Sequence, residues 1–414
     1  MSGTTTTGTA RPGALNFKTR PLLVFWETTR ACLLACKHCR ASALAEPLPG
    51  QLSPESGKDL IRQVSEFGRP APVLVLTGGD VLMRQDAYEL ATYALSLGIP
   101  TCLSPSVTPL LTQTAIVRMK RLRVRAVSIS LDGGESRTHE QVRGVAGHFE
   151  ETLQTIRALV AADLRVQVNT TVMRSTVEEL ADVAAIVSAL GAQIWEVFFL
   201  IGVGRGAQLR ELDAPTNEEV CHFLFDASRY GFVVRTVEAP FFRRVSRWRR
   251  AREERLGRPE SLEEVRDCFG LGELYGRLRR RLEELIGPGR GHAAAHSVST
   301  RDGKGVIFVA HDGQVHPSGF LPLPLGNARS RHLSGTYRNH PLLRAIRSAQ
   351  FTGRCGVCDF RDICGGSRAR AFAASGDPLA EDPGCAFDPR TLRTSVRRVH
   401  RSTTEFEANS GEFK

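Results

Sequence analysis

The stretch Cys32-Leu-Leu-Ala-Cys36-Lys-His-Cys39 places three cysteines within eight residues, directly after a short apolar run. Three soft thiolate ligands in one compact loop suit an iron-sulfur cluster. Because three cysteines leave one iron of a [4Fe-4S] cluster without a protein ligand, that iron can bind a further molecule. A structural zinc ion would need a fourth ligand, and His38 is awkwardly placed to share one ion with the adjacent Cys39.

The chain on either side of this loop predicts an α/β fold. From about residue 22 to 238, short apolar or β-branched runs alternate with amphipathic segments, as in a parallel βα array. Ser53 as N-cap and Pro54 at the first helical position predict a helix over residues 54–67. The expected strands are residues 22–26, 73–76, 101–103, 126–131, 165–172, 194–199 and 232–237. This pattern predicts a partial, TIM-like barrel.

Polar residues follow several of these strands. The cysteine loop follows the first strand, Gly78-Gly79-Asp80 the second, Ser104 the third and Asp132 the fourth. In βα barrels, the loops at the carboxyl ends of the strands carry the chemistry. We therefore expect these segments to meet at one end of the barrel.

The cysteine loop resembles that of the radical S-adenosylmethionine (SAM) superfamily, whose members carry it after the first strand of a partial (βα)6 barrel. The resemblance implies that the open iron binds the amino and carboxylate groups of SAM. It also implies that an electron from the cluster cleaves a C–S bond, giving a 5'-deoxyadenosyl radical that abstracts hydrogen. An electron donor such as a flavodoxin or ferredoxin would then be a partner.

Two segments resemble SAM-binding motifs of that superfamily. Gly78-Gly79-Asp80 is similar to the GGE motif, in which glycines let the backbone approach the ligand and the carboxylate binds its ammonium group. The simpler alternative is a tight turn capped by Asp80. Ser130 and Asp132 resemble the superfamily's ribose contact, although Asp132 could instead open the turn over residues 132–134.

Further polar residues join the expected SAM site by the same resemblance. His38 stands where the superfamily often places an aromatic residue near the adenine, the alternative being a solvent-facing imidazole. Asn169 lies in an apolar strand, and its amide would face SAM or make a hydrogen bond within the core. Glu196 and Arg205 flank the end of the sixth strand and could reach SAM or the substrate.

A second set of cysteines lies outside the expected barrel: Cys355, Cys358, Cys364 and Cys385. Four thiol ligands close a site, so zinc and a [4Fe-4S] cluster are both possible by ligand count. The surrounding sequence resembles the SPASM or twitch region, which favours an auxiliary [4Fe-4S] cluster. His316-Pro317-Ser318-Gly319 stands where many SPASM domains carry another cysteine, and this predicts one auxiliary cluster rather than two.

These features predict a division of the chain into a disordered tail (1–20), a radical SAM core barrel (21–240), an Arg-rich helical linker (241–300), an auxiliary-cluster domain (301–400) and a second tail (401–414). The hairpin pattern of residues 306–316, with its Asp312-Gly313 turn, would begin the smaller domain. The Arg-rich linker, including Arg243 and Arg244, is interpreted as a solvated helical face or as a basic surface for an acidic substrate or redox partner.

Composition sets outer limits on function. Hydrophobic residues make up 42% of the chain, charged residues 24%, and the net charge is +11. No apolar run approaches the roughly 20 residues of a membrane span, and no secretory signal is visible, which predicts a cytoplasmic protein. In that compartment ten cysteines favour metal ligation over disulfides. The positive charge is concentrated locally, and we do not expect a nucleic-acid partner.

Three isolated cysteines are interpreted separately from the two sets. Cys102 and Cys221 are expected to be buried in the core, as lone cysteines usually are. Cys268 lies in the linker and could instead approach a cluster.

Three functions remain open on the sequence alone. Residues 238–240 and 316–322 resemble segments of haem and haem d1 synthesis enzymes, which favours radical modification of an anionic small molecule such as a porphyrin, with Arg243 and Arg244 holding its carboxylates. Peptide maturation is the second hypothesis. The third, an electron carrier or redox sensor, would have no use for Gly79, Asp80 and Asp132 around an incompletely ligated cluster. No nucleophile or general acid or base stands out.

Overall fold

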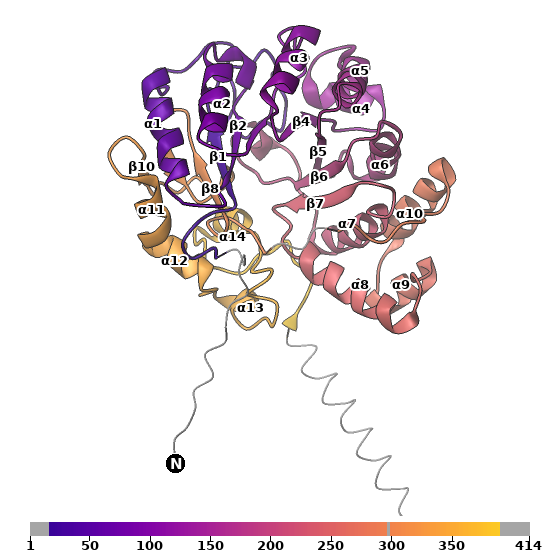
Figure 1. Cartoon of the computed structure of the whole chain (residues 1–414). Helices are drawn as coiled ribbons and strands as arrows, with labels where there is room; N and C mark the ends of the chain where they lie inside the picture. Colours follow the sequence, from indigo (N-terminus) through magenta and orange to yellow (C-terminus); the bar gives the residue numbers. More distant parts are fainter. Residues whose placement is uncertain (1–15, 296–298, 390–414) are drawn as a thin grey trace, which may run out of the picture.

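The computed structural model describes residues 16–295 and 299–389 (Figure 1). Within those ranges ten strands form one sheet in the order β10-β9-β8-β1-β2-β3-β4-β5-β6-β7. The strands are β1 (Leu23–Glu27), β2 (Val73–Thr77), β3 (Thr101–Leu103), β4 (Ala126–Ser130), β5 (Val166–Val172), β6 (Ile194–Phe199), β7 (Val233–Val237), β8 (Val306–Val309), β9 (Gln314–His316) and β10 (Gly326–Asn327). The strands expected from the sequence are confirmed, each boundary lying within one residue of its predicted position.

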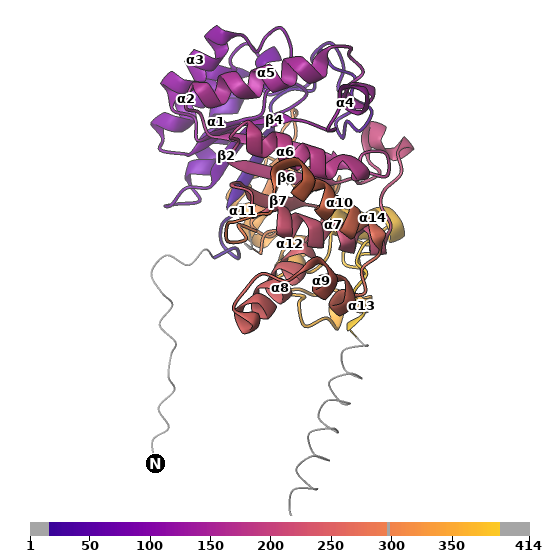
Figure 2. The same cartoon turned by 90° about the vertical axis from the view of Figure 1, so that its right-hand side faces the viewer.

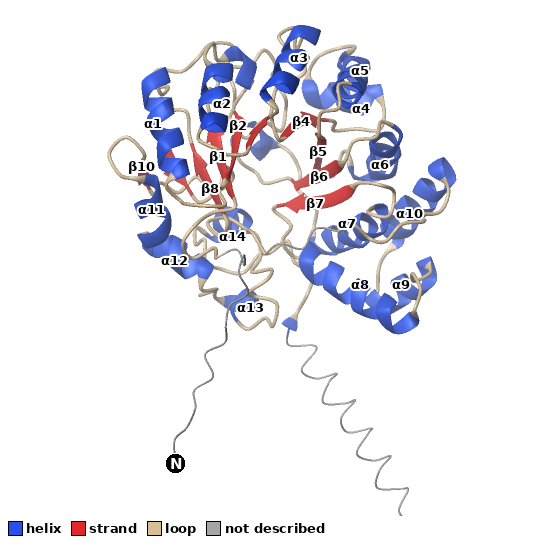
Figure 3. Ribbon diagram, in the orientation of Figure 1, coloured by secondary structure: helices blue, strands red, loops and turns tan. Residues whose placement is uncertain are grey.

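Helices cover the outer face of this curved sheet (Figure 3). They are α1 (Pro54–Ser65), α2 (Ala87–Ser96), α3 (Gln113–Leu122), α4 (Ser136–Arg143), α5 (His148–Ala161), α6 (Leu180–Ala189), α7 (Ala214–Ala227), α8 (Phe242–Leu256), α9 (Leu262–Phe269), α10 (Glu273–Ile286), α11 (Leu333–Asn339), α12 (Pro341–Arg347), α13 (Gly353–Gly356) and α14 (Arg368–Ser375). α1 begins as expected, because the Ser53 hydroxyl accepts a hydrogen bond from the Ser56 N–H at 3.2 Å. The partial α/β barrel is confirmed. No helix among the described residues is long and apolar enough to cross a membrane.

The strands differ in burial between their two faces. β1 to β7 run parallel, and side chains alternate along each strand. The outward side chains pack under the helices, so that Val24, Leu74 and Val168 are fully buried. The inward side chains of β4 and β5, such as Ser130 and Asn169, remain partly exposed. The interior of the barrel is therefore accessible to solvent, unlike the filled core of a closed barrel.

The predicted hairpin is present, and it extends the sheet of the barrel. β8 and β9 pair antiparallel, but β8 also pairs in parallel with β1, through Leu23 with Val306 and Trp26 with Val309. The division of the chain into domains stays a proposal. Of the two expected tails, residues 1–15 and all of 401–414 lie outside the described residues.

The Arg-rich linker is helical, but its central arginines point into the protein. α8 lies at the same end of the molecule as α13 (Figure 2). Arg244 is 2% exposed, and its guanidinium binds both oxygens of Glu218 at 2.7 and 2.6 Å. Arg243 donates to the carbonyl oxygen of Ile363 at 3.3 Å. For these two residues the solvated face and the basic surface are both wrong, because their donors already have partners inside the protein.

Arg249 links three elements through buried ion pairs. Its side chain is fully buried and contacts Asp226 of α7 at 2.6 Å and Glu260, before α9, at 2.9 Å. Removing a member of a buried ion pair leaves the partner charge uncompensated. Arg249 is therefore a structural residue of the linker.

Replacing Arg249 by Leu is expected to lower the free energy of unfolding by about 3 kcal/mol, because Asp226 and Glu260 lose the buried cation that they share and keep only Arg279 and Arg252. Arg255→Leu, at an exposed position of the same helix, is the matched control and should change stability by less than about 0.5 kcal/mol. Urea denaturation followed by circular dichroism measures both. Equal losses for the two variants would contradict the structural role of Arg249.

Candidate functional site

The first cysteine loop lies directly after β1 and presents three sulfurs that each accept a hydrogen bond. Cys32 and Cys36 are 7% exposed, and Cys39 is partly exposed. The donors are the Leu34 N–H to Cys32 at 3.4 Å, Arg143 to Cys36 at 3.5 Å and the Ala43 N–H to Cys39 at 3.5 Å. Such donors stabilise thiolates and tune iron-sulfur clusters. The donor set therefore fits a cluster held by three cysteines.

Arg205 holds the shape of this loop. Its backbone N–H donates to the Cys39 carbonyl oxygen at 3.1 Å, and its side chain donates to the carbonyl oxygens of Cys36 and Ala43, both at 2.9 Å. Gly204 has a positive φ of 57°, and an added Cβ would lie 2.3 Å from the Arg40 carbonyl oxygen. Arg205 therefore holds the cysteine loop through Nε and Nη1, while its Nη2 is buried without a hydrogen-bond partner, so a contact of Arg205 to SAM or substrate stays a prediction.

The Gly78-Gly79-Asp80 segment packs against the start of the cysteine loop. Added Cβ atoms on Gly78 and Gly79 would lie 2.4 Å from the Thr29 carbonyl oxygen and 2.3 Å from the Ala31 carbonyl oxygen. Glycine is thus required at both positions because the backbone of residues 29–31 lies so close, and no ligand is needed to explain them. The Asp80 N–H also donates to the Ala31 carbonyl oxygen at 2.7 Å.

The carboxylate of Asp80 is fully buried and already accepts hydrogen bonds from the protein. It accepts hydrogen bonds from the Leu82 N–H at 3.0 Å, the Ser106 N–H at 3.2 Å and the Thr108 hydroxyl at 2.9 Å. Burial raises its pKa, against the opposing effect of these hydrogen bonds. The capping alternative describes Asp80 better than the ammonium contact does.

Asp132 joins the cysteine loop to two other elements. Its carboxylate lies 2.7 Å from His38 Nε2 and 2.5 Å from Arg143 Nη2, and it accepts the Thr171 N–H of β5 at 2.7 Å. Burial acts to raise the pKa of Asp132, but Arg143 and His38 outweigh burial and hold that pKa well below its ordinary value. Asp132 is 1% exposed. Neither a ribose contact nor a turn-opening role accounts for these contacts, and His38 faces Asp132 rather than solvent.

A buried histidine pair supports Asp132 from behind. The Asp132 N–H donates to His139 Nδ1 at 3.1 Å, so His139 Nε2 carries the hydrogen and donates to His148 Nδ1 at 2.8 Å. His148 Nε2 then donates to the Val107 carbonyl oxygen at 3.0 Å. Burial, together with the charge of Arg143, lowers the pKa of His139 to about 3. The pair is therefore neutral and ties the loop after β4 to the loop after β3.

Sequence reasoning did not identify Arg143 or His139 as residues of the site, although both lie in α4, shortly after Asp132. A single arginine or histidine on a helix carries no local signal of function. Their roles depend on the contact of α4 with the cysteine loop, where the Lys37 N–H donates to the Val142 carbonyl oxygen at 2.9 Å.

Ser104, Ser130 and Asn169 lie on the inner face of the barrel, as expected of residues that share a site. Ser130 pairs in register with Asn169, and Asn169 with Glu196. The Ser104 hydroxyl lies 2.6 Å from that of Ser128 on β4. These side chains are partly exposed to the barrel interior. The structure thus brings the three predicted residues together, with Glu196 beside them.

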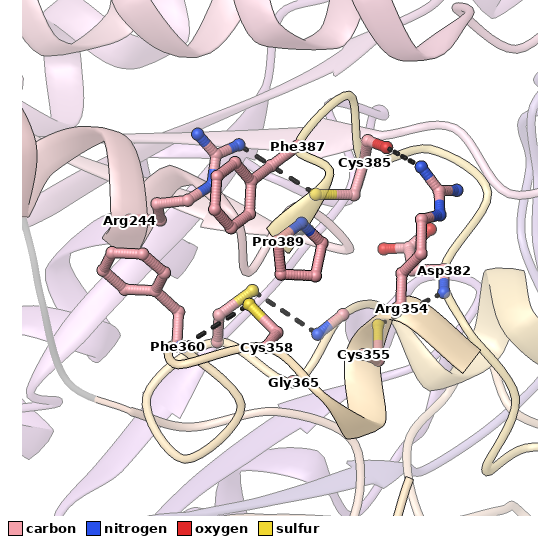
Figure 4. Close-up of a pocket in the computed structure, with 12 residues that line it drawn as sticks. Arg244, Arg354, Cys355, Cys358, Phe360, Gly365, Asp382, Cys385, Phe387 and Pro389 are labelled. Carbon is pink, nitrogen blue, oxygen red and sulfur yellow. Dashed lines mark hydrogen bonds between the residues drawn. The ribbon is translucent and has the colours of Figure 1, made fainter. Parts of the chain in front are cut away.

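The four cysteines of the second set line one pocket (Figure 4). Each sulfur again accepts a hydrogen bond: the Asp382 N–H donates to Cys355 and the Phe360 N–H to Cys358, both at 3.4 Å, the Gly366 N–H donates to Cys364 at 3.4 Å, and Arg244 donates to Cys385 at 4.0 Å. The four predicted ligands are therefore gathered at one place.

Three further arginines surround this pocket without a carboxylate partner within ion-pair distance among the described residues. Arg368 is fully buried, donates to the Ala380 carbonyl oxygen at 2.6 Å, and lies 3.7 Å from the Cys355 sulfur. Arg301 is 6% exposed and donates to the Cys364 carbonyl oxygen at 3.0 Å, and Arg243 completes the set. An anionic four-thiolate centre would balance this charge, whether it holds iron and sulfide or zinc.

None of the ten cysteines forms a disulfide, and three of them lie outside the two sets. Cys221 is fully buried, as expected, and Cys364 and Cys385 are near enough to add to the rise that burial causes in its pKa. Cys102 is largely buried, and burial raises its pKa to about 11. Cys268 is exposed. Among the described residues, no three His, Cys, Asp or Glu side chains lie close enough together to ligate one single metal ion.

Comparison with known proteins identifies the family. Residues 26–187 match the Radical SAM superfamily. The chain is 37% identical over 380 residues to a protein named AdoMet-dependent heme synthase from Oleidesulfovibrio alaskensis, with 91% of this chain and 90% of the relative covered. The chain belongs to the radical SAM superfamily. It is an enzyme, and as a member of this superfamily it uses a [4Fe-4S] cluster and SAM.

Two more comparisons extend this result. A protein of the same name from Nitratidesulfovibrio vulgaris is 36% identical over 374 residues, covering 89% of this chain and 93% of the relative. Among solved structures, SuiB of Streptococcus suis bound to S-adenosylmethionine has a TM-score of 0.60 at 14% identity, covering 89% of this chain and 78% of that one. At this identity the structural match supports the radical SAM fold alone.

Arg205→Ala is expected to weaken iron binding by the first cysteine loop by about tenfold or more, because the side chain no longer holds two loop carbonyls. Iron analysis and electron paramagnetic resonance (EPR) spectroscopy of the reduced enzyme measure the loss. Arg210→Ala, at a nearby exposed position, should keep the wild-type signal. Full iron in Arg205→Ala would refute the role of the side chain.

Asp132→Asn is expected to lower the free energy of unfolding by about 3–5 kcal/mol at neutral pH, because Arg143 stays buried without its carboxylate. The native pKa of Asp132 is depressed, so its stabilisation is full above the unfolded pKa of about 4 and is lost as the pH falls further. Urea denaturation of both proteins between neutral pH and about pH 3 measures the difference. A difference that stays constant through this range would contradict the ion pair.

Proposed function

We propose that this radical SAM enzyme acts on a porphyrin during haem synthesis, at a propionate side chain of the ring. The similarity to two proteins named AdoMet-dependent heme synthase carries the proposal, because it extends over about nine-tenths of this chain and of each relative. A protein named Pre-heme d1 synthase from Dinoroseobacter shibae is also similar, at 27% identity over 382 residues.

The first cysteine loop would hold the cluster, whose chemistry with SAM is the reductive release of a hydrogen-abstracting 5'-deoxyadenosyl radical. The protein supplies position and protection. Arg205 keeps the loop carbonyls in place, and Arg143 directs a positive charge at the Cys36 sulfur. The accessible interior of the barrel would hold the reacting molecules away from bulk water.

We assign SAM binding to the inner face next to the cysteine loop. Ser104, Ser130 and Asn169 offer hydroxyl and amide groups there, and His38 lies at the rim beside Asp132. Gly78, Gly79, Asp80 and Asp132 would shape this site from behind, since their polar groups are engaged within the protein.

For Cys355, Cys358, Cys364 and Cys385 we propose an auxiliary [4Fe-4S] cluster in a SPASM or twitch region. Four ligands, sulfur-directed hydrogen bonds and unpaired buried arginines support it. Zinc would satisfy the same ligand count and charge. Iron and acid-labile sulfide analysis of the protein lacking the first three cysteines distinguishes the two metals.

The remaining proposals concern the surroundings of the enzyme. We propose a flavodoxin or ferredoxin as electron donor and the cytoplasm as the compartment, where cysteines stay out of disulfides, as all ten do here. We also keep the five-part division of the chain, with residues 241–300 as a packed helical linker. A peptide substrate is the alternative, favoured by the 28% identity to a protein named Mycofactocin maturase MftC from Mycobacterium ulcerans.

The test uses the reconstituted enzyme under anaerobic conditions with SAM, dithionite and iron coproporphyrin III. We expect 5'-deoxyadenosine together with loss of propionate carbon from the porphyrin, both followed by mass spectrometry. Replacing Cys32, Cys36 and Cys39 by Ala should abolish both products and retain the iron of the second set. Formation of 5'-deoxyadenosine with an unchanged porphyrin would exclude the proposed substrate and leave the peptide alternative.

A further inference from the structure

Arg235 on β7 lies inside the barrel at the end of a polar row. Ser130, Asn169, Glu196 and Arg235 are neighbours in register across β4, β5, β6 and β7. Side chains at paired positions of neighbouring parallel strands point to the same face. The polar row therefore crosses the inner wall of the barrel and ends in a guanidinium.

Arg235 is near enough to influence two groups on the inner face of the barrel. It acts on the pKa of Glu196, on the adjacent strand, and on that of Cys102 on β3, which lies several strands away along the arc. In both groups burial raises the pKa, and Arg235 opposes that rise. Together with the register of β6 and β7, these effects are consistent with a guanidinium on the inner face of the barrel.

Among the described residues, no carboxylate lies within ion-pair distance of Arg235, and its Nε is buried without a hydrogen-bond partner. The arginines of α8 differ in this respect. Arg244 binds Glu218 through two contacts, and Arg249 binds Asp226 and Glu260. Arg235 is partly exposed, and its Nε, buried without a partner, is a donor that a bound anion could satisfy.

Glu196 does not supply that anion. Its Oε2 accepts a hydrogen bond from Gln167 at 2.9 Å, and the same Gln167 amide donates to Asn169 at 2.8 Å. Burial raises the pKa of Glu196 and Arg235 opposes that rise, but the two side chains are not within ion-pair distance among the described residues. The positive charge of Arg235 is therefore available to a ligand.

The opposite wall of the interior is apolar along most of β1 and β2 and becomes polar only at their last residues, Glu27 and Thr77. The inward side chains of β1 and β2 include Leu23, Phe25, Val73 and Val75, all partly exposed. A ligand between the two walls would meet hydrocarbon on one side and amide, hydroxyl and guanidinium groups on the other. This combination matches a flat apolar ring that carries carboxylates on its edge.

We propose that Arg235 anchors a carboxylate of the substrate inside the barrel, and that this carboxylate is a porphyrin propionate. The inference rests on the proposed function. SAM is the other anion source, but its carboxylate is expected at the open iron beside β1, whereas Arg235 lies on β7. A guanidinium can bind a carboxylate through two parallel hydrogen bonds, which would orient the ring as well as hold it.

The experiment measures porphyrin affinity for the anaerobic holoenzyme, using the Soret absorbance of iron coproporphyrin III and of its methyl ester. Wild-type enzyme should bind the acid more tightly than the ester. Arg235→Gln should weaken binding of the acid by on the order of tenfold or more and remove the preference, while ester affinity stays the same. Arg235→Lys, which keeps the charge, should recover part of the preference.

Two controls complete the design. Arg255→Gln, which removes one positive charge at an exposed site of α8, should bind both porphyrins as the wild type does. Equilibrium dialysis with SAM should give the same affinity for wild type and Arg235→Gln, because Arg235 is assigned to the substrate. A loss of SAM affinity or of ester affinity in Arg235→Gln would overturn the inference.

The outcomes also separate this inference from the proposed function. If wild type prefers the acid and Arg235→Gln keeps that preference, Arg235 is not the anchor, although the porphyrin remains the substrate. If wild type binds neither porphyrin, the proposed function fails, and the propionate assignment fails with it.

Discussion

The buried carboxylate of Asp132 is the contact on which the first site depends. It holds His38 from the cysteine loop, Arg143 from α4 and the Thr171 N–H from β5. Because charges interact strongly in a poorly solvated interior, one ion fixes the relative positions of a loop, a helix and a strand. Arg143 also donates a hydrogen bond to the Cys36 sulfur. The same guanidinium therefore pairs with Asp132 and stabilises the thiolate of Cys36.

The two cysteine sets meet the cost of buried thiolates in different ways. Near the first set, Arg143 is matched by a carboxylate, and Arg205 donates to two carbonyl oxygens of the loop. The second is surrounded by Arg243, Arg301 and Arg368, whose side chains donate to carbonyl oxygens and sulfur. The second environment therefore favours a more negative centre than the first does, independently of which metal occupies it.

Much of the fold could be predicted because it has a local signal. Alternating apolar runs located β1 to β7, and cysteine spacing located both ligand sets. The sequence offered capping as one of two roles for Asp80 but could not choose between them, and it did not predict the ion pairs of Asp132, because a carboxylate after a strand looks the same whether it faces a ligand or the protein. The role of Arg205 in holding the loop could not be predicted for a related reason: its partners there are backbone oxygens, which have no sequence identity.

The parallel pairing of β8 with β1 has a consequence for synthesis of the protein. β1, which carries the first cysteine loop, has neighbours from residues 73–77 on one side and 306–309 on the other. Until the ribosome has released the later segment, β1 is an open edge strand with unpaired backbone groups, prone to wrong association. The first cysteine loop can therefore bind its cluster on a completed sheet only after about three-quarters of the chain has been synthesised.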